Sequence, residues 1–89
     1  MSVISLFYGL IISIYYLDNK QHHLPHIHVK YNEFESVFSI PAGDILDGKS
    51  PSNKIKLIKA WIEIRQEDLM ADWSLAIKQE PIFKIEPLR

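Results

Sequence analysis

Apolar side chains follow different patterns along the chain, and the first pattern predicts a pair of buried strands. Residues 3–17 are almost wholly apolar, rich in β-branched and aromatic side chains, and interrupted by Gly9. This composition favours two strands with a bend at Tyr8–Gly9. A membrane-spanning helix needs about 20 apolar residues, and a signal peptide needs a basic segment before the apolar run. We therefore expect neither a signal peptide nor a membrane anchor.

The second pattern is an alternation with a period of two, and it predicts a β-hairpin. Residues 26–31 and 34–40 alternate on either side of Asn32–Glu33, as in a hairpin with a two-residue turn. The predicted register pairs Tyr31 with Phe34, Lys30 with Glu35, His28 with Val37, and Ile27 with Phe38. One face of this pair is apolar, and the other carries His26, His28, Lys30, Glu35 and Val37. Turns are predicted at residues 41–44 and 47–51, and residues 45–46 are either a short strand or a lead into a loop.

The third pattern predicts helix over residues 52–79, which contain no glycine or proline. Ser50 is placed to cap this helix, with Pro51 at its first position. We expect two helices that meet near residues 66–68, with one kinked helix as the alternative, and an end at Pro81. Residues 82–85 are expected to form a last strand or a docked tail. The predicted apolar stripe comprises Ile55, Ile58, Ile62, Leu69, Trp73 and Ala76, widened by Leu57, Trp61 and Ile64.

These elements predict a single α+β domain over residues 1–89. It consists of a small antiparallel sheet of about four or five strands, with a C-terminal helical hairpin or kinked helix packed on one face. A hydrophobic content of 47% and a charged content of 24% exclude a disordered tail. The formal charge of -1 gives no overall attraction to nucleic acid or to an anionic membrane. The absence of cysteine excludes disulfides and thiolate chemistry, and it favours a reducing compartment.

The four histidines all lie between residues 22 and 28, and they form the main candidate site. His26 and His28 are two positions apart on a predicted strand, so their rings project from the same face and can converge on one divalent metal ion such as zinc. His22 or His23 would then supply a third ligand. The nearest carboxylate candidates are Asp18 and Glu35.

Two other interpretations of the histidines stay open. Two imidazoles can serve as general acid and general base, as in a metal-free ribonuclease, with Tyr15, Tyr16 or Lys30 steadying a phosphate. Alternatively, the histidines are ordinary polar residues on an exposed strand face. A cluster of lysines near the helix start, Lys49, Lys54, Lys56 and Lys59, is a candidate RNA contact. A solvated surface is the preferred interpretation of that cluster, because cations near a helix N-terminus oppose the helix dipole.

Several segments together resemble the bacterial domain-of-unknown-function 4160 family over essentially the whole chain. They are residues 4–9 (ISLFYG), residues 22–28 (HHLPHIH), residues 61–63 (WIE) with Trp73, and residues 84–88 (KIEPL). The histidine segment of the family usually reads His-x-Pro-Pro-His-x-His. His22, Pro25, His26 and His28 fall on that pattern, while Leu24 replaces the first proline and Ile27 stands where an aromatic residue is common.

The resemblance implies a small cytoplasmic prokaryotic protein, often encoded beside a domain-of-unknown-function 2442 protein in a suspected toxin–antitoxin pair. The first hypothesis is a toxin-like component that acts on RNA or translation and is neutralised by an antitoxin-like neighbour. His22, His26 and His28 would be its acid–base residues or, alternatively, ligands of a divalent metal. The second hypothesis is a non-enzymatic binding module or small homo-oligomer whose histidines bind metal or are structural. Whether the protein is an enzyme is left open by these hypotheses.

Overall fold

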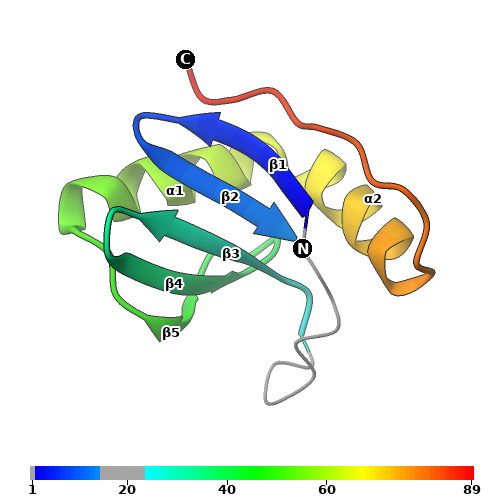
Figure 1. Cartoon of the computed structure of the whole chain (residues 1–89), viewed down its shortest axis with the longest axis horizontal. Coiled ribbons are helices and arrows are strands. Elements are labelled where there is room, and N and C mark those ends of the chain that lie inside the picture. The colour runs from blue at the N-terminus through cyan, green and yellow to red at the C-terminus, as the bar shows by residue number, and fades with distance from the viewer. Residues whose placement is uncertain (1, 15–23) are drawn as a thin grey trace.

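The computed structural model describes residues 2–14 and 24–89, and it contains one five-stranded antiparallel sheet with two helices (Figure 1). The strands lie side by side in chain order and are β1 (Ser2–Phe7), β2 (Leu10–Ile14), β3 (His26–Tyr31), β4 (Phe34–Ser39) and β5 (Ile45–Gly48). The helices are α1 (Ser52–Ile64) and α2 (Gln66–Ile77); in Figure 1, α1 lies behind the sheet and α2 lies to the right of the strands. The predicted α+β class and the two-helix arrangement are confirmed.

The β1–β2 hairpin turns at Tyr8–Gly9, as the sequence predicts. Both residues have positive φ angles, 51° and 80°, which is the conformation that a tight two-residue hairpin turn requires. Phe7 and Leu10 form the closing pair of this hairpin. A register shift between Val3 and Ser5 marks a bulge near the start of β1. The hairpin places β1 at the outer edge of the sheet.

The β3–β4 hairpin has the predicted register throughout, from Tyr31 opposite Phe34 to Ile27 opposite Phe38. Asn32 adopts a φ of 52°, which an asparagine tolerates in a turn. The predicted turn over residues 47–51 is partly wrong, because Asp47 and Gly48 pair with β4 as the end of β5. The carbonyl oxygen of Glu35 accepts the N–H of Lys49, which extends this pairing one residue further.

The helix boundaries differ in detail from the expected ones. The N-cap of α1 is Pro51, without a side-chain cap, because the Ser50 hydroxyl is hydrogen-bonded to the Ser36 hydroxyl instead. The C-terminal end of α2 comes before Pro81: Gln79 adopts a φ of 59°, and the N–H of Glu80 bonds back to the carbonyl of Leu75. This left-handed ending satisfies carbonyls in the last helical turn. Within the described residues, no helix has the length and apolar character needed to cross a membrane.

The hydrophobic core lies between the sheet and the helices. It comprises Ile4, Phe7, Leu10, Ile12, Ile14, Ile27, Val29, Phe38, Ile40, Ile58, Trp61, Ile62, Leu69, Ala76 and Ile85. Most of the predicted helical stripe contributes to it, but Ile64 is 61% exposed at the end of α1, where the chain breaks direction at Arg65. The face of the sheet opposite α1 is the open face, and the strand register places His28, Lys30 and Glu35 on it. His26, two positions before His28, lies at the end of this face, where its ring packs against Trp73 of α2.

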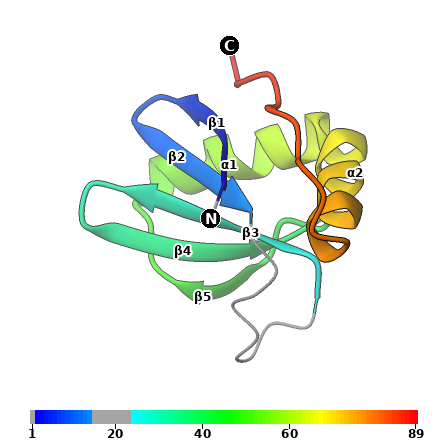
Figure 2. The ribbon, with the colours of Figure 1, turned by 45° about the vertical axis from the view of Figure 1, so that its right-hand side comes forward.

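The last residues form a docked tail and no further strand. Residues 80–89 leave α2 and return beside β1, as Figure 2 shows. Ile85 is buried, and its N–H bonds to the carbonyl of Ile4, while its carbonyl accepts the hydroxyl of Ser5. On the helix side, Trp61 Nε1 donates to the carbonyl of Glu86. The tail therefore joins the outer strand of the sheet to α1.

Candidate functional site

His26 lies at the start of β3 and is completely buried. Its Nδ1 is 2.7 Å from the carbonyl oxygen of Leu24, and its ring centroid is 5.0 Å from that of Trp73 on α2. A carbonyl oxygen can only accept, so Nδ1 carries a proton, and in the neutral ring the acceptor lone pair is on Nε2. Packing and hydrogen bonding together hold this imidazole in one orientation.

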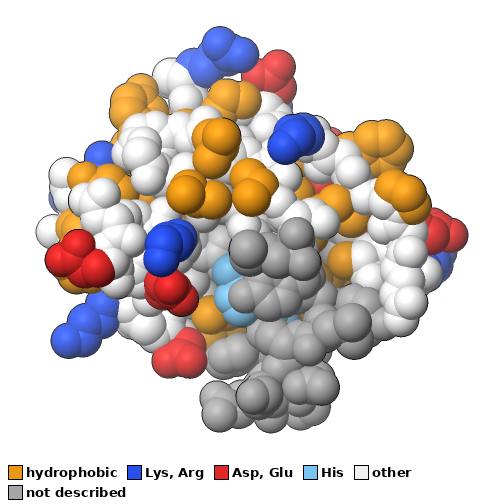
Figure 3. Space-filling view, in the orientation of Figure 1, with side chains coloured by type: hydrophobic (Ala, Val, Ile, Leu, Met, Phe, Trp, Pro, Cys, Tyr) orange, Lys and Arg blue, Asp and Glu red, His pale blue; other side chains and the backbone are white. Residues whose placement is uncertain are grey.

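His28 is only partly buried and lies beside His26 on the open face. The two ring centroids are 5.2 Å apart with an interplanar angle of 67°, so one ring meets the edge of the other. Across the strands, His28 is opposite Ser13 of β2 and Val37 of β4, both of which are buried. Histidine atoms reach the surface of this face in Figure 3. We call His26 and His28 the histidine pair.

Of the predicted site residues, the structure brings His26 and His28 into contact. The others lie apart from this pair or outside the described residues. His22, His23, Asp18, Tyr15 and Tyr16 lie outside the described residues. Within residues 2–14 and 24–89, no group of three metal-ligating side chains comes together.

The remaining carboxylate candidate on the open face, Glu35, is ion-paired with Lys30. The carboxylate of Glu35 accepts a hydrogen bond from Lys30 Nζ at 3.2 Å in an exposed pair, as the predicted register implies. The described part of the chain therefore offers the two imidazoles, but not a complete metal site.

Two of the four clustered lysines have structural roles. Lys54 Nζ donates to the carbonyl of Tyr8 at 3.1 Å and lies 4.9 Å from the ring centroid of Tyr31. Lys59 Nζ donates to the carbonyl of Gly43 at 2.8 Å. Both contacts tie α1 to turns of the sheet, which is a structural role that the sequence did not predict for these lysines.

Asp72 is a buried carboxylate that the sequence interpretation missed. It is 2% exposed, and its Oδ1 accepts the N–H of Phe83 in the tail at 3.0 Å, while Oδ2 is buried without a hydrogen-bond partner among the described residues. Burial raises the pKa of Asp72, and the nearby negative charge of Asp68 adds to this, against the lowering effect of the Phe83 hydrogen bond. The spacing Leu69, Asp72, Ala76 on one helical stripe could have predicted the inward position.

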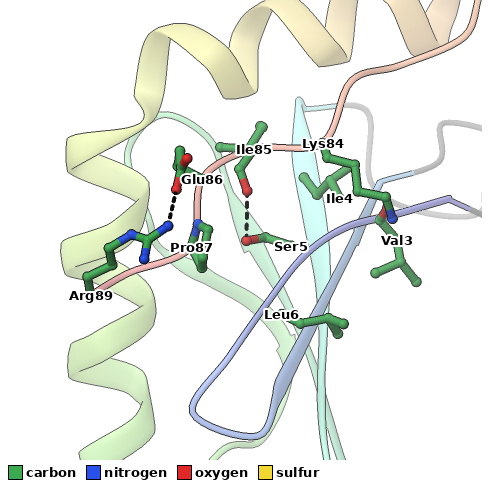
Figure 4. A pocket seen from close by; sticks show the side chains of 9 residues that line it. All are labelled: Val3, Ile4, Ser5, Leu6, Lys84, Ile85, Glu86, Pro87 and Arg89. Atoms are coloured by element: carbon green, nitrogen blue, oxygen red, sulfur yellow. Dashed lines mark hydrogen bonds and ion pairs between the residues drawn. The ribbon is translucent and has the colours of Figure 1, made fainter.

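A groove runs along the outer edge of the sheet, between β1 and the tail (Figure 4). Its volume is about 390 Å³, and its walls are formed by residues 3–6 of β1 and residues 84–87 with Arg89 of the tail. The Arg89 guanidinium forms an ion pair with the Glu86 carboxylate at 2.8 Å and lowers the pKa of Glu86. This groove was not predicted from the sequence.

These observations define a class: a small α+β protein whose five-stranded antiparallel sheet carries a histidine pair on its open face. The family model of the Domain of unknown function (DUF4160) matches residues 9–74. The chain therefore belongs to the DUF4160 family, as its histidine segment indicates. No curated protein and no solved structure matches the chain.

Proposed function

We propose that this protein is the toxin-like component of a toxin–antitoxin pair and acts in the cytoplasm on RNA or another component of translation. The class of function comes from the resemblance of the chain to its family. The observation that carries the assignment of residues is the contact between the buried His26 ring and the partly exposed His28 ring. A side chain at the surface can meet a substrate, and a fully buried one acts through its neighbours.

The burial of the two rings divides their roles in this proposal. His28 is the acid–base group that contacts the substrate, because imidazole exchanges protons near neutral pH. His26 is a positioning residue. The Leu24 carbonyl and the Trp73 ring hold its imidazole in place, and that imidazole packs against the ring of His28. His22 is given an assisting role only because it falls on the histidine pattern of the family. Lys30, two residues along the same face, is the cation closest in sequence to His28 for a phosphate group.

The test is growth arrest on expression of the chain alone, with rescue by the neighbouring gene. We expect His28→Ala to abolish the arrest while the protein stays folded, as judged by its melting curve. Glu33→Ala, an exposed change in the β3–β4 turn, is the matched control and should arrest growth like the parent. A parent chain that does not arrest growth refutes the toxin proposal. Arrest of parental strength by folded His28→Ala refutes the role of the histidine pair.

A second candidate function, a non-enzymatic metal-binding module, is favoured by the geometry of the same pair. Metal-bound histidines commonly donate their second ring N–H to a carbonyl, as His26 does to Leu24. With a Zn–N distance of about 2.0 Å and tetrahedral angles, two ligating ring centroids are about 5.2 Å apart. The observed separation is 5.2 Å. His22 or His23 would have to complete the ligand set.

Metal analysis separates the two candidates. The binding module predicts one zinc ion per chain after dialysis against zinc chloride at pH 7.5, and loss of that ion to chelator or below about pH 6, where imidazoles become protonated. His28→Ala should lower the bound zinc to background, whereas Glu33→Ala should not. Protein that retains no zinc at pH 7.5 eliminates this candidate and leaves the toxin proposal in place.

A further inference from the structure

The outer edge of β1 is only partly covered by the tail. Three contacts reach this edge: Ile85 N–H to the Ile4 carbonyl, the Ser5 hydroxyl to the Ile85 carbonyl, and Lys84 Nζ to the Val3 carbonyl. The tail then runs towards α1 (Figure 4), where Trp61 Nε1 donates to the carbonyl of Glu86. Coverage by the tail therefore stops one residue before Leu6.

The backbone of Leu6 faces the open part of this edge. In a hairpin with a two-residue turn, the closing residues bond to each other, here Phe7 and Leu10. The residue before the closing pair then points its N–H and C=O away from the partner strand, so those of Leu6 point to the outside of the sheet. An uncovered edge of this kind is a template for an additional strand.

The walls of the groove define what such a strand should carry. Leu6, which lines the groove, is 61% exposed, and Ile11, its partner on β2, is 37% exposed, so the surface beside the edge is apolar. The rim carries Lys84 and Arg89 against the single carboxylate of Glu86, which is ion-paired with Arg89, so the net charge of the rim is positive. The groove is therefore complementary to an extended segment with aliphatic side chains and acidic residues.

A second copy of this chain fits the edge poorly. If β1 paired with its symmetry mate about Leu6, Tyr8 of the mate would lie opposite Ile4, where Ile85 of the tail is already bonded. The two cationic rims would also face each other. A short segment from a different protein avoids both conflicts.

We propose that the groove between β1 and the tail receives an extended, acidic segment of a partner protein, which adds to the sheet as a short strand beside Leu6. Recognition follows the general mode of β-strand addition, with backbone hydrogen bonds to Leu6 and charge contacts to Lys84 and Arg89. The inference rests on the proposed function to the extent that the antitoxin-like neighbour is the expected donor of this segment. The groove lies at the outer edge of β1, whereas the histidine pair lies on the central strand β3, so partner binding and chemistry use different residues.

The experiment uses the full chain and a fluorescein-labelled pentapeptide of alternating glutamate and valine as probe. We expect saturable binding with a Kd below about 1 mM, and amide shifts in NMR spectra centred on Leu6 and Ile85. The same peptide with every backbone nitrogen methylated should lose binding, because it cannot donate to the Leu6 carbonyl. A peptide of alternating lysine and valine should bind at least about tenfold more weakly.

Charge reversals on the protein give the matched comparison. Arg89→Glu and, separately, Lys84→Glu should each weaken binding of the acidic peptide by about fivefold or more, while Lys56→Glu, an exposed change on α1, should leave it within about twofold. The proposal is overturned if the acidic peptide does not bind at about 5 mM, if the methylated peptide binds equally well, or if the shifts map elsewhere. These measurements use purified protein, so a chain that fails to arrest growth refutes only the toxin proposal.

Discussion

The Nδ1 of His26 donates to the carbonyl oxygen of Leu24, two residues earlier, across 2.7 Å. This local hydrogen bond holds the ring against the backbone that leads into β3. Trp73 of α2 packs against the same ring. His26 is thus part of the folded framework, whereas His28, two residues along the strand, lies partly in solvent. The two histidines should therefore respond differently to mutation.

Replacement of His26 should destabilise the protein far more than replacement of His28. His26→Ala removes a fully buried ring with its hydrogen bond, and we expect a loss of about 2–3 kcal/mol in the free energy of unfolding. His28→Ala should cost less than about 1 kcal/mol. Urea denaturation at pH 7 measures both. Equal losses would show that His26 is not the anchored member of the pair.

Replacement of Asp72 by asparagine should stabilise the protein near neutral pH. The neutral amide keeps the acceptor for the Phe83 N–H and removes a buried charge with one unpartnered oxygen. We expect a gain of about 1 kcal/mol, measured as a rise in the urea midpoint at pH 7. Asp44→Asn, an exposed change, should leave the midpoint almost unchanged. A loss of stability in Asp72→Asn would mean that the ionised carboxylate stabilises the tail.

The stabilising effect of Asp72→Asn should also depend on pH with a definite sign. The pKa of Asp72 is raised in the folded protein, so the native state binds this proton more tightly than the unfolded chain does. The corresponding stabilisation is present below the ordinary aspartate pKa and is lost as the pH rises through the raised value. The difference between variant and parent should therefore be small at pH 3–4 and grow towards neutral pH, which a series of urea titrations records.

Trp61→Phe should loosen the tail without unfolding the sheet. The substitution keeps most of the buried aromatic surface but removes the indole N–H that binds the Glu86 carbonyl, at a cost of about 1–2 kcal/mol. Hydrogen exchange at the Ile85 amide, which is bonded to Ile4, should become faster. Trp73→Phe is the matched control, because Trp73 packs on His26, and it should leave exchange at Ile85 unchanged. Unchanged exchange in Trp61→Phe would refute the anchoring role.

Gly48 and Gly43 provide a matched pair of glycine substitutions. Both have a φ of 81°, so alanine at either position is strained by about 1 kcal/mol. At Gly48 an added Cβ would also collide with the backbone of Glu35 and Ser36, whereas at Gly43 the nearest atoms, in the side chains of Ile62 and Lys59, are 3.9 Å away. We expect Gly48→Ala to cost at least about 2 kcal/mol more than Gly43→Ala in thermal or urea unfolding.

Local sequence signals predicted most of the strands, and they predicted the pairing of β3 with β4. The turn at Asn32–Glu33 fixed the register of β3 and β4 down to the Lys30–Glu35 ion pair, because a two-residue loop allows only one pairing. The helix ends were less predictable, since they depend on contacts made elsewhere. Ser50 was expected to cap α1, but its hydroxyl bonds to Ser36 on β4, which is distant in sequence.

The candidate site was predicted in its residues but not in its environment. The spacing of His26 and His28 placed both rings on one face, as observed. Nothing in that spacing indicated that Trp73, on a helix 47 positions later in the printed sequence, would cover His26. Burial of a polar residue is set by tertiary packing, so periodicity alone could not separate the anchored histidine from the accessible one.

The contact between Ser5 and Ile85 spans 80 positions of sequence. During synthesis on the ribosome, Ser5 is therefore made 80 residues before Ile85, and the outer edge of β1 is not covered until the tail has been made. Closing a loop of this length carries a substantial entropic cost, and the contact is gained only when the rest of the sheet has brought its ends together. A nascent chain exposes the whole edge of β1 until the tail is made. During that interval a partner strand could occupy the edge before the tail does.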